Sequence, residues 1–174
     1  MIHKAANQME DLLNNYTKLL KFKSIDYKMV DMNEIIEESI EISAEFLQRN
    51  AVEVFFDKKY TTLKTHANQA YLRQVFVNLI KNSSEAFPNE RSERNILIST
   101  DIQVDRIFIN FIDTGKGIPA DNWDSIFDPF ITSKSEGLGF GLPFVKNIIL
   151  EHRGDIKVMD SSPKGTHIQI ILPQ

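Results

Sequence analysis

An alternating strand pattern ends beside two closely spaced glycines in Ile109-Asn110-Phe111-Ile112-Asp113-Thr114-Gly115-Lys116-Gly117-Ile118-Pro119. Apolar residues recur at every second position up to Asp113, as in a strand that buries one face. Gly115 and Gly117 follow, and glycine permits backbone conformations that other residues avoid. The stretch predicts a strand that ends in a carboxylate beside tightly folded backbone, which is a basis for a specific pocket.

Three further segments support this interpretation. Asn78-Leu79-Ile80-Lys81-Asn82 lies upstream, while Phe127-Asp128-Pro129-Phe130 and Gly137-Leu138-Gly139-Phe140-Gly141 lie downstream. In this order the four segments resemble the N, G1, F and G2 boxes of the nucleotide-binding fold shared by sensor histidine kinases, Hsp90, DNA gyrase and MutL. Each box alone is weak, but four in this order are a strong signal. The resemblance is closest to the catalytic domain of bacterial histidine kinases and covers nearly the whole chain.

Composition narrows the possible functions. The chain has 174 residues, which suits one compact domain with a short helical extension. It contains no cysteine, so disulfides, thiolate zinc sites and cysteine nucleophiles are excluded, and its four histidines lack metal-ligand spacing. The net charge of -4 argues against nucleic acid as the main partner. No apolar run has the length of a membrane span or the form of a signal peptide, so we expect a cytoplasmic domain, whose longer parent could carry its own membrane anchor.

We expect residues 1–23 to form a helix that is separate from the catalytic domain at 24–174. Apolar residues are spaced alternately by three and four, as in a heptad seam: Ile2, Ala5, Met9, Leu12, Tyr16 and Leu19. Such a helix either packs on its own domain or forms half of a helical hairpin, and the second interpretation is favoured. The segment resembles the second helix of the dimerisation and phosphoacceptor module of histidine kinases.

Capping residues and periodicity outline the remaining elements. They predict helices at about 32–49, 69–87 and 141–152, and strands at 52–56, 62–65, 96–102, 106–112, 155–159 and 166–172. A long loop over 114–136 is rich in glycine, proline and serine, and such a loop in a compact domain is usually functional. The expected fold class is an α/β (α+β) sandwich with a mixed β-sheet covered on one face by helices, plus the N-terminal bundle helix.

Asp113 carries the most specific functional inference. An ionised carboxylate only accepts hydrogen bonds, and adenine presents an amine donor where guanine presents a carbonyl acceptor. A buried aspartate would therefore favour ATP over GTP, and in the resembled family it is the residue that reads adenine. One alternative is a simple turn cap in the Asp-Thr-Gly bend. Another is the aspartic protease signature, but that enzyme needs two such carboxylates and the chain has one copy.

The glycine-rich segments suggest contacts with phosphates. Gly137, Gly139 and Gly141 directly precede a predicted helix, whose N-terminus presents amide groups and a positive dipole end. Glycines also mark ordinary turns, so this pattern alone is weak. The resemblance adds Gly115, Gly117, Ile118 and Leu142 to the nucleotide pocket.

Two asparagines lie on one flank of a predicted helix beside its apolar stripe. We expect Asn82 to bind Mg²⁺, with Asn78 next to it, because magnesium takes oxygen ligands and keeps several waters. The alternative is a pair of polar surface asparagines. The resemblance also assigns Lys134, in the long loop, to the terminal phosphates, and Thr166, in the last strand, to a position near adenine and the aspartate.

The identity of Asn78 separates subclasses of the family. The Hsp90, gyrase and MutL relatives carry a glutamate there as the general base for water, and an amide cannot take that proton. We therefore expect slow ATP hydrolysis and phosphoryl transfer to an acceptor, with Glu85 the only nearby alternative base. None of the four histidines has the acidic residue and proline that follow the family's phosphoacceptor histidine.

The resemblance therefore implies the ATP-binding fragment of a two-component sensor histidine kinase. It would bind Mg-ATP and donate the γ-phosphate to a histidine on a separate dimerisation module, with Asn82 and Lys134 as catalytic residues. A response regulator and a homodimeric full-length protein are the implied partners. An anti-sigma-factor-like serine kinase and a nucleotide-regulated protein-binding module remain alternatives.

Overall fold

The computed structural model describes residues 26–88, 90, 93–129, 131 and 139–174. The helix predicted for residues 1–23 lies outside the described residues, and so do Lys134 and Gly137. The helices are α2 (Met32–Ile42), α3 (Ala44–Arg49), α4 (Gln69–Ser84) and α5 (Gly141–Glu151), with two 3-10 turns, η1 (Ala120–Asn122) and η2 (Ser125–Phe127). The strands are β1 (Lys28–Asp31), β2 (Glu53–Lys58), β3 (Lys64–Ala67), β4 (Asn95–Gln103), β5 (Arg106–Asp113), β6 (Asp155–Ser162) and β7 (Gly165–Pro173).

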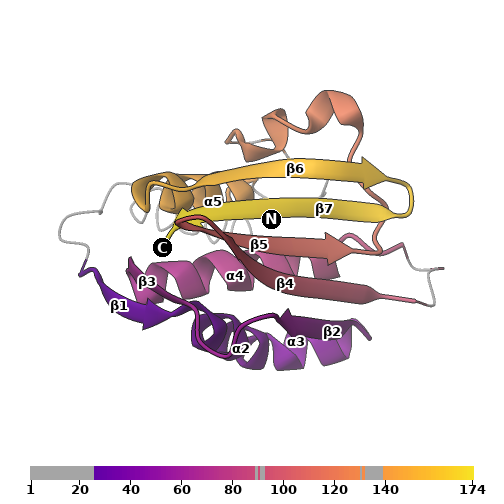
Figure 1. The fold of residues 1–174 in the computed structure, drawn as a ribbon. Coiled ribbons are helices and arrows are strands. Elements are labelled where there is room, and N and C mark those ends of the chain that lie inside the picture. The colour runs from indigo at the N-terminus through magenta and orange to yellow at the C-terminus, as the bar shows by residue number, and fades with distance from the viewer. Residues whose placement is uncertain (1–25, 89, 91–92, 130, 132–138) are drawn as a thin grey trace, which may run out of the picture.

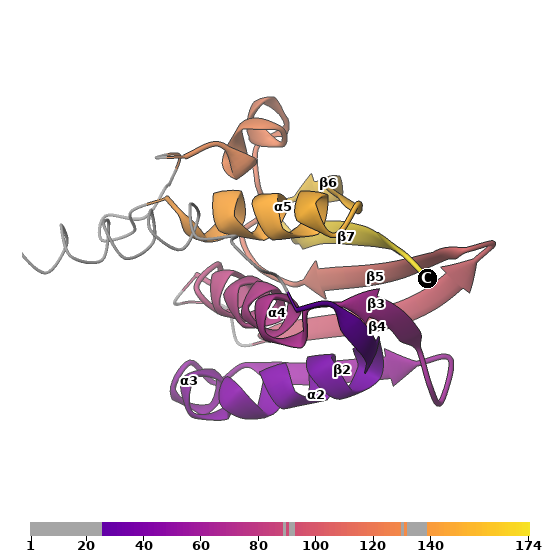
Figure 2. The ribbon, with the colours of Figure 1, turned by 90° about the vertical axis from the view of Figure 1, so that its left-hand side faces the viewer.

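A five-stranded mixed sheet forms the framework, in the order β2-β4-β5-β7-β6. β2 and β4 run parallel, and every other pair in this sheet is antiparallel. Helices α2, α4 and α5 lie along one face of the sheet (Figures 1 and 2). The expected α+β sandwich with helices on one face is therefore confirmed.

The core lies between the helices and the strands that they cover. Alternate residues of β5 point inward, so Ile107, Ile109 and Phe111 are buried while their neighbours are more exposed. The predicted stripe of α4 is buried along its whole length: Leu72, Val75, Phe76, Leu79, Ile80 and Ser83. Burial of one aliphatic or aromatic side chain of this size contributes about 1.5–3 kcal/mol. Phe76 of α4 stacks on Phe111 of β5 with ring centroids 5.9 Å apart, so this packing joins the two elements.

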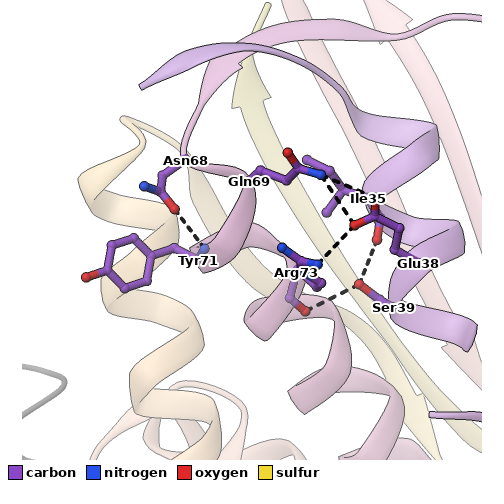
Figure 3. Close-up of polar contacts among 7 residues, drawn as sticks. All are labelled: Ile35, Glu38, Ser39, Asn68, Gln69, Tyr71 and Arg73. Carbon is purple, nitrogen blue, oxygen red and sulfur yellow. Dashed lines mark hydrogen bonds and ion pairs between the residues drawn. The ribbon is translucent and has the colours of Figure 1, made fainter. Parts of the chain in front are cut away.

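Side-chain hydrogen bonds define where two helices begin. Asp31 caps α2 by accepting the backbone N–H of Asn33 at 3.0 Å. Asn68 caps α4 by accepting the backbone N–H of Tyr71 at 2.9 Å, as its position in the sequence predicted (Figure 3). Each of these bonds satisfies an amide that the first helical turn would otherwise leave unpaired.

Polar contacts join α2 to α4 beside this cap (Figure 3). The Glu38 carboxylate pairs with Arg73 at 3.3 Å and accepts from the Gln69 amide at the same distance. These groups are partly exposed, so their contribution is modest, and the apolar contacts beneath them supply most of the packing energy.

Several predicted boundaries were wrong. The single helix expected to Arg49 is interrupted at Ser43, whose hydroxyl donates back to the Ser39 carbonyl at 2.8 Å. Such back-bonding competes with the helical ladder and bends the helix. Ala44, the first residue after the break, is exposed. Helix α4 ends at Ser84 rather than Phe87 because the Ala86 N–H donates to the Ser83 carbonyl in a tighter turn.

The strand expected at 62–65 is displaced and has a partner that the sequence did not reveal. It runs over Lys64–Ala67 and pairs antiparallel with β1, which was not predicted. β1 is too short for a clear alternation pattern, and only pairing with β3 makes it a strand. No described helix has the length and apolar character needed to cross a lipid bilayer.

An aromatic cluster anchors the first described residues to the far end of α5. The Tyr27 ring lies 5.0 Å from that of His152, and its hydroxyl donates to the Glu151 carbonyl at 2.9 Å. His152 is buried, and its Nε2 accepts the backbone N–H of Asn68 at 3.1 Å. Burial lowers the pKa of His152, although the Ile148 carbonyl and the nearby Glu151 oppose the shift.

This lowered pKa predicts a pH-dependent stability. An imidazole whose pKa is lower in the folded than in the unfolded state favours folding while neutral, and this contribution falls as pH drops below about 6.5. Chemical denaturation between pH 7.5 and 5.5 should show a declining free energy of unfolding, and the decline should be shallower in His152→Gln. Burial also lowers the pKa of His167, so the decline should be shallower in His167→Gln as well. An unchanged slope in His152→Gln would contradict the prediction.

Candidate nucleotide-binding site

Asp113 is the last residue of β5 and lies at the end of the covered face. It pairs with Ile96 of β4 on one side and with Thr166 of β7 on the other. Its side chain follows Phe111 on the alternating buried side and is 7% exposed. Asp113 Oδ1 accepts the backbone N–H of Gly115 at 2.9 Å. The carboxylate therefore does cap the turn, and a carboxylate has about four acceptor positions in all.

Thr166 is brought to Asp113 by the register of the sheet. Both side chains are buried on the helix-covered side of neighbouring strands. Gly165 makes this close approach possible: a Cβ there would lie 1.9 Å from the Asp113 carbonyl oxygen, and the residue has a φ of +147°. Only glycine fits this position without displacing the strands.

The loop after Asp113 is held between the end of α4 and the β6–β7 hairpin. The Lys116 N–H donates to the Ala86 carbonyl at 3.0 Å. A Cβ on Gly117 would lie 1.9 Å from the Ser162 carbonyl oxygen, and its φ is +76°. Gly115 and Gly117 therefore allow close backbone contact, as the sequence predicted. Gly115 itself is buried.

Ile118 is fixed through both of its backbone groups. Its N–H donates to Ser161 Oγ at 2.7 Å, and its carbonyl accepts from the Trp123 indole N–H at 3.1 Å. Trp123 immediately follows η1, so the first turn of the long loop is tied to the segment that follows Asp113. Part of this loop is thus locally ordered, through the turns η1 and η2.

Of the two asparagines of α4, Asn82 lies at the start of α5. Asn78 and Asn82 are both half-buried. A Cβ on Gly141 would lie 3.4 Å from Asn82 Nδ2 and 3.8 Å from Asn82 Oδ1, so the amide of Asn82 faces the first residue of α5. Two boxes separated by some sixty residues in the sequence are therefore in contact.

The first turn of α5 combines glycine with apolar anchors. Gly139 has a φ of +70°, and Phe140 is buried. The Phe144 N–H donates to the Phe140 carbonyl at 3.0 Å, which begins the helical ladder, and Leu142 packs against the core. The predicted helix start at Gly141 is confirmed, and this first helical residue lies beside Asn82.

Oxygen donors rather than a histidine or carboxylate cluster characterise this site. Among the residues that the structure describes, no group of three or more His, Asp or Glu side chains could hold a metal ion. Asn82 offers an amide oxygen, and phosphate oxygens would complete a magnesium shell that retains several waters. The chemistry of the donor set therefore fits Mg²⁺ bound together with a nucleotide.

Sequence reasoning missed Ser161 and Trp123. Neither belongs to a box, yet Ser161 contacts Ile118 and Thr166, and Trp123 contacts Ile118. Ser161 could have been noticed as the residue paired with Thr166 once Ser162-Pro163-Lys164-Gly165 is identified as a tight turn. No comparable signal marks Trp123.

Together, the mixed sheet, the buried carboxylate at the end of β5 and the contact between α4 and the start of α5 define a nucleotide-binding domain of the class that the boxes indicated. Residues 67–174 match the family model described as histidine kinase-, DNA gyrase B-, and HSP90-like ATPase. The chain belongs to this family, and the family's ATPase character implies ATP binding.

Similar proteins within the family are sensor kinases. The chain is 31% identical to the sensor histidine kinase ZraS of Salmonella typhimurium, over 98% of this chain and 36% of that protein. It is 29% identical to sporulation kinase C of Bacillus subtilis, over 99% of this chain and 40% of that protein. The catalytic domain of the histidine kinase ThkA superposes with a TM-score of 0.76 at 25% identity, over 85% of this chain and 95% of that domain. The chain thus spans well under half the length of these two curated relatives.

Proposed function

We propose that this chain is the ATP-binding catalytic part of a two-component sensor histidine kinase. It binds Mg-ATP and donates the γ-phosphate to a histidine on a dimerisation module. The observation that carries the proposal is the buried Asp113 carboxylate, which lies beside Thr166 on the face where Asn82 meets the start of α5. The relatives that are named as sensor kinases support transfer of the γ-phosphate to a protein acceptor rather than to water.

The proposed site has a base-binding end and a phosphate-binding end. Asp113 and Thr166 accept hydrogen bonds from adenine, and Gly115, Gly117 and Ile118 form the backbone wall around it. At the other end, the α5 N-terminus and its glycines receive the phosphates. The ATP-binding set is Asn78, Asn82, Asp113, Gly115, Gly117, Ile118, Lys134, Gly137, Gly139, Gly141, Leu142 and Thr166.

Catalysis in this proposal rests on positioning and charge. Bound Mg²⁺ would neutralise charge on the phosphate oxygens during transfer. Asn82 holds the metal through its amide oxygen, and Lys134 supplies a cation to the terminal phosphates. Asn78 cannot accept a proton from water, so hydrolysis stays slow. Glu85, one turn beyond Asn82, is exposed. An exposed carboxylate is less suited to act as the general base for water in the site.

The remaining proposals concern the parent protein. Residues 1–23 would form the second helix of a dimerisation module, joined at about residue 24 to the catalytic domain. A homodimer, a response regulator as the next phosphoryl acceptor and a cytoplasmic location follow from a sensor kinase of this kind.

A labelling experiment tests this function and separates it from the alternatives. Incubated alone with γ-labelled Mg-ATP, the chain should gain almost no acid-labile phosphate, since none of its histidines has acceptor context. Addition of the parent's histidine-bearing bundle helix, in cis or as a fragment, should produce acid-labile, base-stable label on that helix. The same helix with its acceptor histidine replaced by alanine is the control. Acid-stable label on a partner would support a serine kinase, and efficient labelling of the isolated chain would refute the fragment interpretation.

A further inference from the structure

Ser161, on β6, is the hub of a hydrogen-bond network at the base-binding end. Its hydroxyl oxygen accepts the Ile118 N–H at 2.7 Å and lies 3.1 Å from Thr166 Oγ1 and 3.2 Å from the Gly165 carbonyl oxygen. It therefore contacts the loop after Asp113 and the strand that pairs with Asp113. Ser161 pairs directly with Thr166 in the sheet, so the contact follows from strand register.

The donor and acceptor capacities of these groups determine the direction of each bond. A serine hydroxyl has one proton and two lone pairs. Ile118 N–H takes one lone pair, and the Gly165 carbonyl can only accept, so it takes the proton. The Thr166 hydroxyl then donates its own proton to the second lone pair of Ser161. Satisfying all three contacts leaves Thr166 Oγ1 as an acceptor.

An acceptor at Thr166 has a consequence for base recognition. Thr166 and Asp113 are paired neighbours on the buried side of the sheet, and both then present oxygen lone pairs. Adenine carries an amine with two protons at the position where hypoxanthine and guanine carry a carbonyl acceptor. Two acceptors next to each other favour the amine and oppose the carbonyl, because like lone pairs would remain unpaired.

Ser161 also holds the backbone wall of the same pocket. A Cβ on Gly117 would lie 3.2 Å from Ser161 Oγ, so the glycine loop rests directly on this side chain. The bond to Ile118 fixes the distance between that loop and the β6–β7 hairpin. Without the hydroxyl, the loop loses its connection to the strand that carries Thr166.

We propose that Ser161 is a positioning and specificity-determining residue of the adenine pocket. It orients the Thr166 hydroxyl as an acceptor and fixes the Gly117–Ile118 backbone against the β6–β7 hairpin. This inference rests on the proposed adenine-nucleotide function and assigns to that site a residue outside the sequence boxes.

The test compares Ser161→Ala with Ser161→Thr and Ser162→Ala by calorimetry with Mg-ADP and Mg-IDP. Ser161→Ala should weaken Mg-ADP binding about tenfold, the size expected for one hydrogen bond at a buried site, and should narrow the preference for Mg-ADP over Mg-IDP. Ser161→Thr keeps the hydroxyl and should remain within about threefold of the unaltered chain. Ser162 is the matched control because it is exposed and its hydroxyl accepts a local bond from Lys164 N–H, at 3.3 Å.

The outcomes separate this inference from the proposed function. If the unaltered chain binds Mg-ADP and Mg-IDP equally, the adenine-nucleotide function fails and this inference fails with it. If the unaltered chain prefers Mg-ADP, and Ser161→Ala keeps both its affinity and that preference, the role of Ser161 alone is overturned. A Ser161→Thr variant as weak as Ser161→Ala would also overturn it, since the hydroxyl would then not be the active group. A purely structural role would lower affinity for both nucleotides equally and leave their ratio unchanged.

Discussion

Replacement of Asp113 by asparagine is expected to remove the preference for adenine nucleotides. Asparagine keeps one acceptor oxygen, which can still bind the Gly115 N–H, so the turn is preserved. Its amide group places donor protons where the carboxylate offered lone pairs, and these protons oppose the adenine amine. Mg-ADP affinity should fall roughly 10- to 100-fold, equivalent to the loss of a charged hydrogen bond of ~1.5–3 kcal/mol. The affinity for Mg-IDP, which carries a carbonyl at that position, should change little.

Calorimetry with both nucleotides measures this change directly. Asp57→Asn is a suitable control because that carboxylate is exposed on β2, at the edge of the sheet. The free energy of unfolding of Asp113→Asn should remain close to that of the unaltered chain, which shows that the turn is intact. Unchanged affinity for Mg-ADP in a folded variant would leave Asp113 as a turn cap with no role in recognition.

Replacement of Asn82 by alanine should strongly slow phosphoryl transfer while sparing the fold. The Asn82 amide faces the first residue of α5, where the proposed phosphates and magnesium meet. Stabilisation of transition-state charge by a bound metal is worth several kcal/mol, so loss of its protein ligand should slow transfer by roughly a thousandfold. Labelling of the supplied bundle helix with γ-labelled ATP over a magnesium titration gives the rate.

Binding in EDTA distinguishes a metal ligand from a general packing residue. Without magnesium, ADP should bind Asn82→Ala and the unaltered chain with affinities within about threefold, because the adenine contacts remain. Asn147→Ala provides the matched control, since Asn147 is an exposed asparagine on α5. Transfer within tenfold of the unaltered rate would show that Asn82 does not hold the metal.

The elements that the sequence predicted well are those with local signals. The stripe of α4 repeats at a helical period over four turns, and Asn68 precedes it as a capping residue. The alternation through β5 ends at Asp113, so both the strand and its terminal carboxylate could be identified. These features arise from neighbours along the chain, where backbone geometry alone brings side chains to one face.

Elements that depend on distant partners could not be predicted in the same way. β1 is a strand only because β3, more than thirty residues away in the sequence, pairs with it. Ser161 belongs to no motif, and its contact with Ile118 joins residues 43 positions apart. No local propensity encodes such a contact, because it exists only after the sheet has assembled.

By itself, the sequence determined the strand that ends in Asp113, the glycines that follow it, the helix with Asn78 and Asn82, and the family to which these boxes belong. The resemblance had placed Thr166 near the aspartate, and the strand register confirms that Asp113 and Thr166 are paired neighbours. Only the tertiary structure decided that Asn82 faces Gly141 and that Ser161 links the loop to the hairpin. The physical reason is that strand register and helix packing, which act between distant segments, bring these side chains within contact distance. Periodicity and composition specify which face a residue occupies, whereas hydrogen-bond geometry requires the partner to be in place.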